Sequence, residues 1–426
     1  MDWARWLRAG DHLVCSHMSS EPVALLQSLA QSLTESLTES LASSAPPLPL
    51  HLMLGVPFSD AAQALPSDCE ITVYGGMGSA SRLAQARPVH LSPLRYSLCA
   101  QVYQQGLWPV DVVLVSLARN AEGHLYLGAS HGPALAAARR ARHVIAEVNA
   151  QSPCVSGARW PDDIPLAAVL EVDHEPAPVR QSAPSQVEQA IAGHVAALVP
   201  DGACLQVGIG ALPSAMLTAL SSHRHLGVHS GMYTDDLQAL VDAGAVDHSR
   251  KTRDPGVAVV GCVVGSRSLY RSVHQHSAVC LRSPDLTHDA AFIAGIDDFF
   301  SLNSAIEVDL LGNVNAEAVL GQDARWRHVG GVGGLPDFVR AAQCAKRGQS
   351  VMALPSRSAG QQPRIVARLS GPCTVAASDA DLICTEYGVA RLRHASLDQR
   401  VRSMLAIAHP QDRDALAMAA HGLGLV

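Results

Sequence analysis

Short apolar runs, most of them bounded by glycine, proline or polar residues, alternate along the chain with longer stretches rich in alanine and leucine. The run Asp111–Ser116 is apolar at nearly every position, as expected of a strand that is covered on both faces. The alanine- and leucine-rich stretches repeat with a helical period of about 3.6 residues and therefore predict helices. This alternation favours an α/β fold in which helices cover both faces of a parallel sheet.

The same pattern places the other regular elements. Further strands are predicted at Asp11–Cys15, Leu50–Leu54, Glu70–Tyr74, His143–Val148, Cys204–Val207, Val257–Val264, Ala305–Leu310, Ser350–Leu354 and Leu382–Thr385. Helices are predicted at Pro22–Glu39, Ala134–Arg142 and Gln186–Leu198, from about Pro213, and from near Asp235.

The segment Val172–Ser185 contains three prolines and few apolar side chains. Such a composition is typical of an extended linker between domains. We therefore predict two α/β domains, residues 1–178 and 186–426, each built on an open parallel sheet.

Composition narrows the class of protein. Of the 426 residues, 48% are hydrophobic and 16% are charged, which is too apolar for a disordered chain. No apolar run reaches the roughly 18 residues of a transmembrane helix. The 31 basic residues do not exceed the 38 acidic ones, so no nucleic-acid partner is expected. The first residues lack a basic region followed by an apolar run, which predicts a cytoplasmic protein.

The ten cysteines are spread along the chain without a CxxC pair. In the cytoplasm they are expected to be free thiols, and those in apolar runs should pack as small hydrophobic groups. No histidine pair has the spacing of a helical metal site, so no metal ion is predicted.

Two glycine clusters lie where catalytic chemistry could be placed. Gly208 and Gly210 follow the strand Cys204–Val207, where the first N–H groups of a helix can bind an anion or an oxyanion. A tight turn without a ligand explains this first cluster equally well. In the second cluster the backbone either folds sharply or lies against a bulky ligand, and we favour the ligand; its glycines are Gly330, Gly331, Gly333 and Gly334. Neither cluster continues as a dinucleotide fingerprint or a P-loop.

Four polar residues are further candidates. His229 and Ser230 lie where an apolar strand gives way to a polar loop, and either could act as acid, base or nucleophile. A loop that only caps the next helix is the alternative. Glu307 and Glu386 are carboxylates in apolar surroundings, which must be paired, hydrogen-bonded or shifted in pKa. We expect Glu307 to be structural and Glu386 to point into a cleft.

Taken together, these segments resemble the acetyl-CoA hydrolase/transferase family, which includes 4-hydroxybutyrate and succinyl-CoA:acetate CoA-transferases. The matching stretches, in collinear order, are Leu205–Pro213, Gly227–Asp235, Asn303–Asn315, Gly330–Arg340, Ala353–Ser356, Thr385–Gly388, Arg391–Arg393 and Ala406–Pro410. The N-terminal half is similar more loosely, at Gly10–Asp11, Ser20–Pro22, Asp111–Ser116 and Ala146–Asn149.

The resemblance implies two related open α/β domains with the active-site cleft between them. The substrates it implies are an acyl-CoA, which brings coenzyme A, and a small carboxylic acid. In this family a glutamate attacks the thioester, and enzyme-bound anhydride and thioester intermediates follow. A chain of this architecture commonly forms a homodimer.

The resemblance also assigns roles to individual residues. It places the 330–334 glycine cluster at the thioester and at coenzyme A, and we predict Gly208, Gly210 and Lys346 as further contacts of coenzyme A. Asn315 corresponds to a polar site residue, and Glu386 to an auxiliary acid near the nucleophile.

Gly231 departs from the family at the nucleophile itself. The family has a His-Thr-Glu-Met-like segment where this chain reads His229-Ser-Gly-Met232, so Gly231 stands in place of the glutamate. Another carboxylate, such as Glu386, Glu21 or Glu147, could replace it. Alternatively, a water or a substrate carboxylate could attack directly from the vacated space.

Three hypotheses follow. The first is an acyl-CoA enzyme, either a CoA-transferase that does not use the usual glutamate or a thioester hydrolase. The second is a non-catalytic acyl-CoA-binding relative, and the third is unrelated chemistry on the same scaffold. We rank acyl-CoA chemistry first because the glycine cluster, Asn315 and Glu386 are all present.

Overall fold

The computed structural model describes residues 1–38, 49–177 and 183–425, which form two compact units. The first unit is Met1–Val179 with Val260–Thr287, and the second is Arg180–Val259 with His288–Val426. The segment Val260–Thr287 therefore packs with the first unit, although it lies inside the range 186–426 predicted for the second domain.

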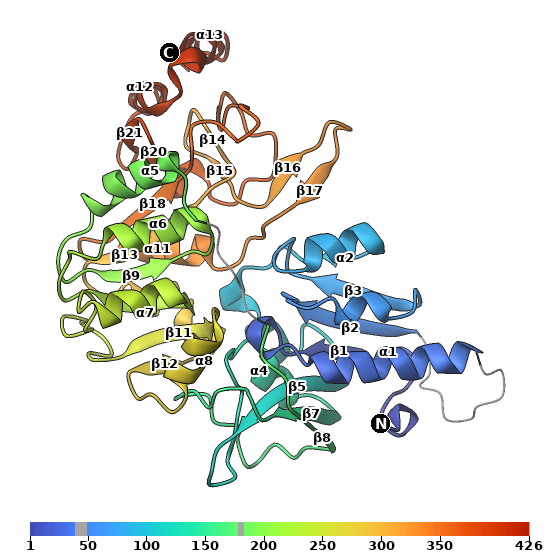
Figure 1. Cartoon of the computed structure of the whole chain (residues 1–426). Helices are drawn as coiled ribbons and strands as arrows, with labels where there is room; N and C mark the ends of the chain where they lie inside the picture. Colours follow the sequence, from blue (N-terminus) through green and yellow to red (C-terminus); the bar gives the residue numbers. More distant parts are fainter. Residues whose placement is uncertain (39–48, 178–182, 426) are drawn as a thin grey trace. The chain divides into compact units, whose positions relative to one another are not determined.

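The first unit is built on an eight-stranded sheet with the strand order β4-β3-β2-β1-β5-β7-β8, in which β6 pairs with β5 (Figure 1). Neighbours along this order are parallel, and β6 is antiparallel to β5. Its elements are β1 (His12–Cys15), α1 (Val23–Thr38), β2 (Leu50–Gly55), β3 (Cys69–Val73), α2 (Ala80–Ala86), β4 (His90–Leu91), α3 (Gln101–Gln104), β5 (Val112–Arg119), β6 (Leu125–Tyr126), α4 (Ala134–Ala138), β7 (His143–Asn149), β8 (Ala168–Val172), α8 (Arg267–Val273), β12 (Val279–Leu281) and α9 (Pro284–Thr287).

The core of the first unit lies between α1 and one face of this sheet. Leu25, Leu29 and Leu33 project from α1 into one buried cluster with alternating strand residues such as Leu50 and Leu52. The alternation arises because successive residues of a strand face opposite sides of the sheet.

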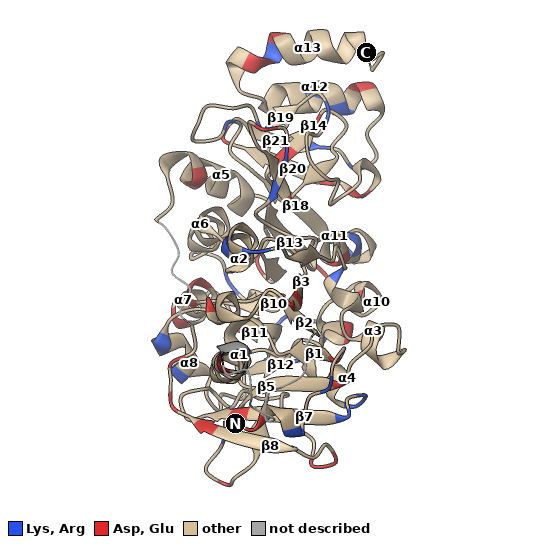
Figure 2. Ribbon diagram, turned by 90° about the vertical axis from the view of Figure 1, so that its right-hand side faces the viewer, with Lys and Arg blue, Asp and Glu red and all other residues tan. Residues whose placement is uncertain are grey.

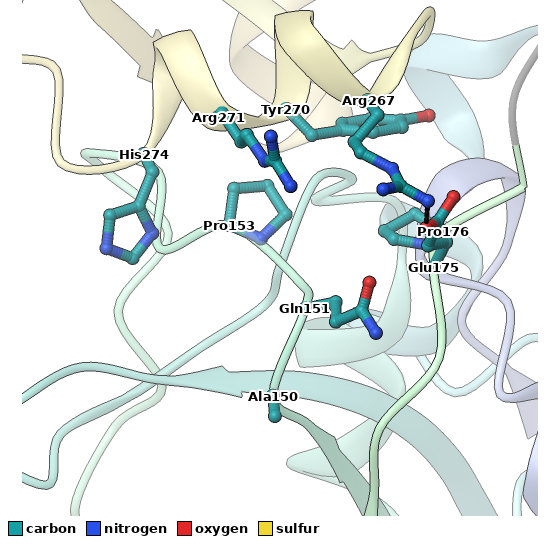
Figure 3. Close-up of a pocket in the computed structure, with 9 residues that line it drawn as sticks. All are labelled: Ala150, Gln151, Pro153, Glu175, Pro176, Arg267, Tyr270, Arg271 and His274. Carbon is teal, nitrogen blue, oxygen red and sulfur yellow. Dashed lines mark ion pairs between the residues drawn. The ribbon is translucent and has the colours of Figure 1, made fainter.

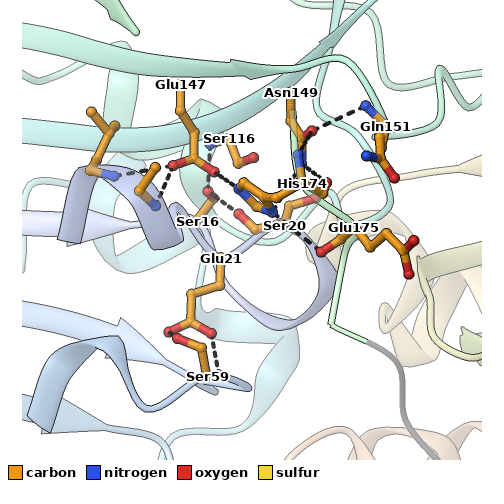
Figure 4. A network of polar contacts seen from close by, with 12 residues as sticks. Ser16, Ser20, Glu21, Ser59, Ser116, Glu147, Asn149, Gln151, His174 and Glu175 are labelled. Atoms are coloured by element: carbon orange, nitrogen blue, oxygen red, sulfur yellow. Dashed lines mark hydrogen bonds and ion pairs between the residues drawn. The ribbon is translucent and has the colours of Figure 1, made fainter. Parts of the chain in front are cut away.

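Glu147 joins this sheet to the start of α1 (Figure 4). Its side chain is fully buried, and Oε2 accepts hydrogen bonds from the backbone N–H groups of Ala24 and Leu25 at 2.9 and 3.2 Å. Oε1 lies 3.6 Å from Nε2 of His174, and contact with this carboxylate raises the pKa of His174. The first N–H groups of a helix lack partners within the helix, so the carboxylate completes the N-terminus of α1.

The second unit contains the strand order β10-β9-β13-β18-β20-β21, which is parallel except for the antiparallel strand β21. Its elements are α5 (Gln186–Ala196), β9 (Cys204–Val207), α6 (Ala211–Ala219), β10 (Gly227–Tyr233), α7 (Asp235–Asp242), α10 (Ala290–Ile293), β13 (Phe299–Ser304), β14 (Glu307–Asp309), β15 (Val314–Asn315), β16 (Ala318–Leu320), β17 (Trp326–His328), α11 (Leu335–Cys344), β18 (Gln349–Ala353), β19 (Ile365–Val366), β20 (Leu382–Thr385), β21 (Gly388–Arg391), α12 (Leu397–Ile407) and α13 (Arg413–Gly422). The strand β11 (Ala258–Val263) begins in the second unit and ends in the first.

The predicted α/β class with parallel sheets is confirmed. The strands predicted at Cys204–Val207 and Leu382–Thr385 have the observed bounds. The strand predicted at Ala305–Leu310 contains the short β14, Glu307–Asp309, but the longer strand before it, β13, Phe299–Ser304, was not predicted. Serine and asparagine interrupt the apolar pattern of β13 and hid this strand from a prediction based on hydrophobicity.

The structure also shows where the charged residues lie and in what state the cysteines are. Acidic and basic residues are interspersed over the elements of both units (Figure 2). The ten cysteines are present as free thiols. Over residues 1–38, 49–177 and 183–425, no helix has the length and hydrophobicity needed to cross a membrane.

Replacing Glu147 with alanine is expected to lower the free energy of unfolding by about 3 kcal/mol, because two N–H groups of α1 lose their buried acceptor. The matched control is Glu171→Ala, since Glu171 is an exposed carboxylate on β8 that pairs with Arg119 at 2.7 Å. The control should cost less than about 1 kcal/mol. Urea unfolding followed by circular dichroism measures both, and equal losses would contradict an anchoring role for Glu147.

Candidate active site

Three neighbouring strands of the second unit bring their carboxyl ends together beside glycines. The parallel register pairs Cys204 of β9 with Gly227 of β10 and with Phe299 of β13. Continuing this register places Gly231, Gly208 and Asn303 side by side. A Cβ on Gly208 would lie 3.0 Å from Oδ1 of Asn303, so the strands approach closely here because Gly208 has no side chain.

The side chains of His288 and Phe338 lie next to Gly231. A Cβ on Gly231 would lie 3.1 Å from Nε2 of His288 and 3.7 Å from Cε2 of Phe338. The first of these distances is too short for an undisturbed contact. A larger residue at position 231 therefore requires the His288 imidazole to move by a few tenths of an ångström.

His288 lies between α9 and α10 and was not among the residues predicted from the sequence. Its side chain is buried, and its ring packs on Phe338 with the ring centroids 4.6 Å apart. A Cβ on Gly334 would lie 2.2 Å from Cδ2 and 2.6 Å from Nε2 of His288. The imidazole thus lies against two glycines from distant parts of the sequence, and its present position requires both.

The surroundings of His288 keep its imidazole uncharged. Burial, with a smaller contribution from the nearby His229, lowers the pKa of His288 to about 3. Gly334 is the N-cap of α11, and the positive end of that helix dipole also disfavours a protonated ring. At neutral pH the ring therefore offers one N–H donor and one acceptor nitrogen.

The glycine loop that was predicted to contact coenzyme A immediately precedes α11. A Cβ on Gly330 would lie 2.2 Å from the carbonyl oxygen of Ala316, and Gly333 has a φ of +51°, a conformation that favours glycine. Gly331 lies in the same loop. Beyond the end of β9, Gly210 has a φ of +126° and is the N-cap of α6.

His229 and Ser230, the two polar candidates on β10, are both fully buried. His229 faces the same side of the sheet as Gly231, and its ring centroid lies 5.8 Å from that of Phe292. The Oγ of Ser230 lies 3.3 Å from both the backbone nitrogen and the carbonyl oxygen of Val207, so this hydroxyl links β10 to β9.

A buried polar cluster beside Gly231 was also missed by the sequence reading. Oε1 of Gln206 accepts hydrogen bonds from Oγ of Ser301 at 2.6 Å and from Nδ2 of Asn303 at 2.9 Å. All three side chains are buried on neighbouring strands. The sequence does contain a signal for this cluster: Ser301 and Asn303 are polar residues at alternate positions of an otherwise apolar strand. This pattern indicates a face of the sheet on which hydrogen-bonded side chains are buried.

Asn315, on β15, is joined to Glu307 of β14. Its Nδ2 donates to Oε1 of Glu307 at 3.0 Å and to the carbonyl oxygen of Ala318 at 2.7 Å. The same Glu307 oxygen accepts from the backbone N–H groups of Ser370 and Gly371 at 2.7 and 2.9 Å. These bonds agree with the structural role expected for Glu307 and hold the Asn315 amide in the same network.

Glu386 and Lys346 lie away from Gly231. Glu386 follows β20 and accepts hydrogen bonds from the N–H and the hydroxyl of Ser356 at 2.9 and 2.5 Å. Four strand steps of about 4.8 Å each separate β20 from β10, or roughly 19 Å. Lys346 follows the C-terminus of α11 at the opposite edge of the sheet, where it is largely exposed and contacts Asp297 at 3.5 Å.

The two carboxylates of the first unit that could replace the nucleophile are engaged in backbone contacts (Figure 4). Glu21 accepts hydrogen bonds from the N–H groups of Phe58 and Ser59 at 2.8 and 2.6 Å, and Glu147 completes the start of α1. Burial is the main cause of the raised pKa of Glu21. The structure therefore places both carboxylates in structural roles within the first unit.

The first unit also contains a pocket of about 520 Å³ (Figure 3). Arg267, Tyr270, Arg271 and His274 line it from α8 and the turn after it, and the ion pair between Arg267 and Glu175 lies at its rim. None of the predicted site residues lines this pocket. Among the residues that the structure describes, no group of three His, Cys, Asp or Glu side chains is arranged to hold a metal ion.

Known proteins resemble the chain in sequence and in structure. Residues 265–420 match the acetyl-CoA hydrolase/transferase C-terminal domain family. The 4-hydroxybutyrate coenzyme A transferase of Clostridium kluyveri is 34% identical over 319 residues, which cover 74% of this chain and 73% of that protein. The butyryl-CoA:acetate CoA-transferase of Anaerostipes caccae is 32% identical over 341 residues, covering 77% and 75%. The crystal structure of RipA from Yersinia pestis superposes with a TM-score of 0.88 at 28% identity and covers 99% of this chain and 96% of RipA.

Replacing Gly330 with alanine is expected to lower the free energy of unfolding by about 1 to 3 kcal/mol, because the new Cβ would overlap the Ala316 carbonyl oxygen. The matched control is Gly193→Ala in α5, where a Cβ meets no atom within 4 Å. There the helix-forming tendency of alanine should stabilise the chain by up to about 1 kcal/mol. Chemical denaturation measures both, and a neutral Gly330→Ala would show that the loop does not need this glycine.

Proposed function

Because the chain belongs to the acetyl-CoA hydrolase/transferase family, we propose that it transfers coenzyme A from an acyl-CoA to a small carboxylic acid without an enzyme carboxylate as nucleophile. The chain is thus an enzyme of a family that contains CoA-transferases and acetyl-CoA hydrolases. The observation that carries the proposal is the environment of Gly231, which has no side chain and where a Cβ would already lie 3.1 Å from Nε2 of His288.

The contacts of the other candidate carboxylates support the same proposal. Glu21 and Glu147 accept hydrogen bonds from backbone N–H groups of the first unit, which reduces the nucleophilicity of their oxygens. Glu386 is held by Ser356 and lies four strands from Gly231. The acceptor acid brings a carboxylate of its own, so the reaction does not need one from the protein.

Direct transfer then proceeds through a mixed anhydride of the two acids. An oxygen of the acceptor carboxylate attacks the thioester carbonyl carbon; a C–O bond forms, the C–S bond breaks and the CoA thiolate leaves. The thiolate next attacks the acceptor carbonyl of the anhydride and releases the donor acid. Backbone N–H groups at the start of α11 are suited to stabilise the oxyanion of each step.

Hydrolysis of the thioester is the second candidate function. Its supporting observation is the missing side chain at Gly231, since a water could attack from the position of the acceptor carboxylate, and the family includes acetyl-CoA hydrolases by name. The homodimer and the cytoplasmic location remain predictions.

Incubation with butyryl-CoA or acetyl-CoA and a panel of short acids is expected to yield the new acyl-CoA. Double-reciprocal plots of the initial rate against one substrate, at several fixed concentrations of the other, should give intersecting lines. This pattern is expected because both substrates bind before the first product leaves. Borohydride should leave no reduced glutamate on any peptide. Parallel lines with a reduced Glu386 would contradict the proposal, free CoA without a new thioester would favour hydrolysis, and CoA binding without turnover would favour a binding protein.

A glutamate introduced at position 231 by itself should not form a covalent intermediate. Gly231 does not have a positive φ, so a glutamate is allowed by the backbone, but its Cβ would lie 3.1 Å from Nε2 of His288. We expect Gly231→Glu to form no enzyme-bound thioester, whereas Gly231→Glu combined with His288→Ala should form one that borohydride traps on residue 231. His288→Ala alone is the control. A trapped thioester in the Gly231→Glu single variant would show that the imidazole does not block this position.

A further inference from the structure

We propose that the pocket of the first unit is a binding site for a phosphate monoester (Figure 3). The inference goes beyond the proposed function, because none of the residues assigned to the transfer reaction lines this pocket. Its volume of about 520 Å³ lies within the range of pockets that hold small molecules, roughly 300 to 1,000 Å³. The first unit therefore provides the space that such a ligand needs.

Three segments of the first unit form the walls of the pocket. Residues 150–153 follow β7, and residues 175–176 follow β8. The third wall is α8 with the turn after it, which lies here because the segment Val260–Thr287 packs with the first unit. A ligand in the pocket would contact all three segments.

The wall formed by α8 is basic. Arg267 and Arg271 are four residues apart on this helix, so their side chains lie on the same face of it. Arg267 forms an ion pair with Glu175, whereas Arg271 forms no ion pair or side-chain hydrogen bond with any residue that the structure describes. Figure 3 shows both guanidinium groups pointing away from α8 toward the other walls. The wall thus carries one guanidinium more than the adjacent carboxylate neutralises, which favours an anionic ligand.

His274 adds a third hydrogen-bond donor to this wall. The backbone N–H of Cys154 donates a hydrogen bond to its Nδ1 at 3.2 Å. A neutral imidazole that accepts at Nδ1 carries its hydrogen on Nε2 and can donate from there. His274 can therefore contribute to the binding of an anion without being protonated.

This set of donors favours phosphate over carboxylate. A carboxylate pairs with one guanidinium through its two oxygens, which would leave the second arginine without a partner. A phosphate monoester has three terminal oxygens and a charge of about −1.5 to −2 near neutral pH, so it can accept from both arginines and from His274. Arg267 has N–H groups besides the one that contacts Glu175. Pro153 and the ring of Tyr270 add apolar surface for the organic part of the ester.

Two kinds of molecule carry such a group. Coenzyme A has a phosphate monoester on its ribose, and many metabolites carry one independently of coenzyme A. The glycines and the lysine predicted to contact coenzyme A belong to the second unit, whereas the pocket belongs to the first. The pocket is thus a site additional to those predicted contacts.

Calorimetric titration of the full chain with inorganic phosphate and with AMP tests this assignment. We expect both to bind, and we expect the dicarboxylate succinate to bind at least about tenfold more weakly than AMP. Arg271→Ala should raise the Kd of AMP about 10- to 100-fold, because the anion loses the guanidinium that has no other partner. Glu175→Gln should lower this Kd about threefold, since the carboxylate no longer competes for Arg267.

The matched controls remove the same charges from an ion pair outside the pocket. Arg139 and Asp163 pair at 2.9 Å in the first unit, and Arg139 is about as exposed as Arg267. Arg139→Ala and Asp163→Asn should each leave the Kd of AMP within about twofold. Equal changes in the pocket variants and the controls would show a general effect of charge and overturn the proposal. A wild-type chain that binds neither phosphate nor AMP would also overturn it, and so would equal affinity for succinate and AMP.

Competition with acyl-CoA identifies the source of the phosphate. If saturating butyryl-CoA displaces AMP, and Arg271→Ala weakens the binding of butyryl-CoA, the pocket holds the nucleotide end of the coenzyme. If AMP binds equally well in its presence, the ligand is a separate phosphate ester. Both results support the phosphate site. Neither requires turnover, so a failure of the proposed function is distinguishable from a failure of this inference.

Discussion

A buried imidazole needs room, and at the carboxyl edge of the second sheet that room exists because Gly231 and Gly334 carry no side chains. Protein interiors are densely packed, so a methyl group on Gly334, 2.2 Å from Cδ2 of His288, would move the ring, and one on Gly231, 3.1 Å from Nε2, would require a smaller shift. One packing constraint thus links the residue at the position of the family nucleophile, the glycine loop before α11, and His288. The buried position of His288 depends on both Gly231 and Gly334.

The same constraint separates this chain from a relative with a glutamate at position 231. A Cβ at position 231 would lie 3.1 Å from Nε2 of His288, so a side chain there requires the ring to shift by a few tenths of an ångström. The other carboxylates are already committed: Glu147 to the start of α1, Glu307 to Asn315 and Ser370, and Glu386 to Ser356. Buried carboxylates are stable only with such partners, and the partners fix where the oxygens point.

The fold was largely predictable because parallel strands are short apolar runs and their helices are amphipathic. β9 and β20 were predicted with their observed bounds. β13 was not, because Ser301 and Asn303 interrupt its apolar pattern, and their burial depends on Gln206 of a neighbouring strand. His288 could not be found either, since its importance comes from contacts with Gly231 and Gly334, which are remote in sequence. Lys346 follows the glycine loop closely in sequence, but α11 carries it to the other edge of the sheet, and its contact with coenzyme A stays a prediction.

The most direct test of transfer without an enzyme nucleophile follows the oxygen atoms of the acceptor acid through a single turnover. With enzyme in excess over butyryl-CoA, and with acetate labelled by ¹⁸O in both oxygens, the mixed anhydride carries an acetate oxygen onto the butyryl group. Mass spectrometry of the released butyrate should therefore find one ¹⁸O atom per molecule. Unlabelled butyrate formed together with acetyl-CoA in that first turnover would show that the oxygen came from a carboxylate of the protein, and would contradict transfer without an enzyme nucleophile.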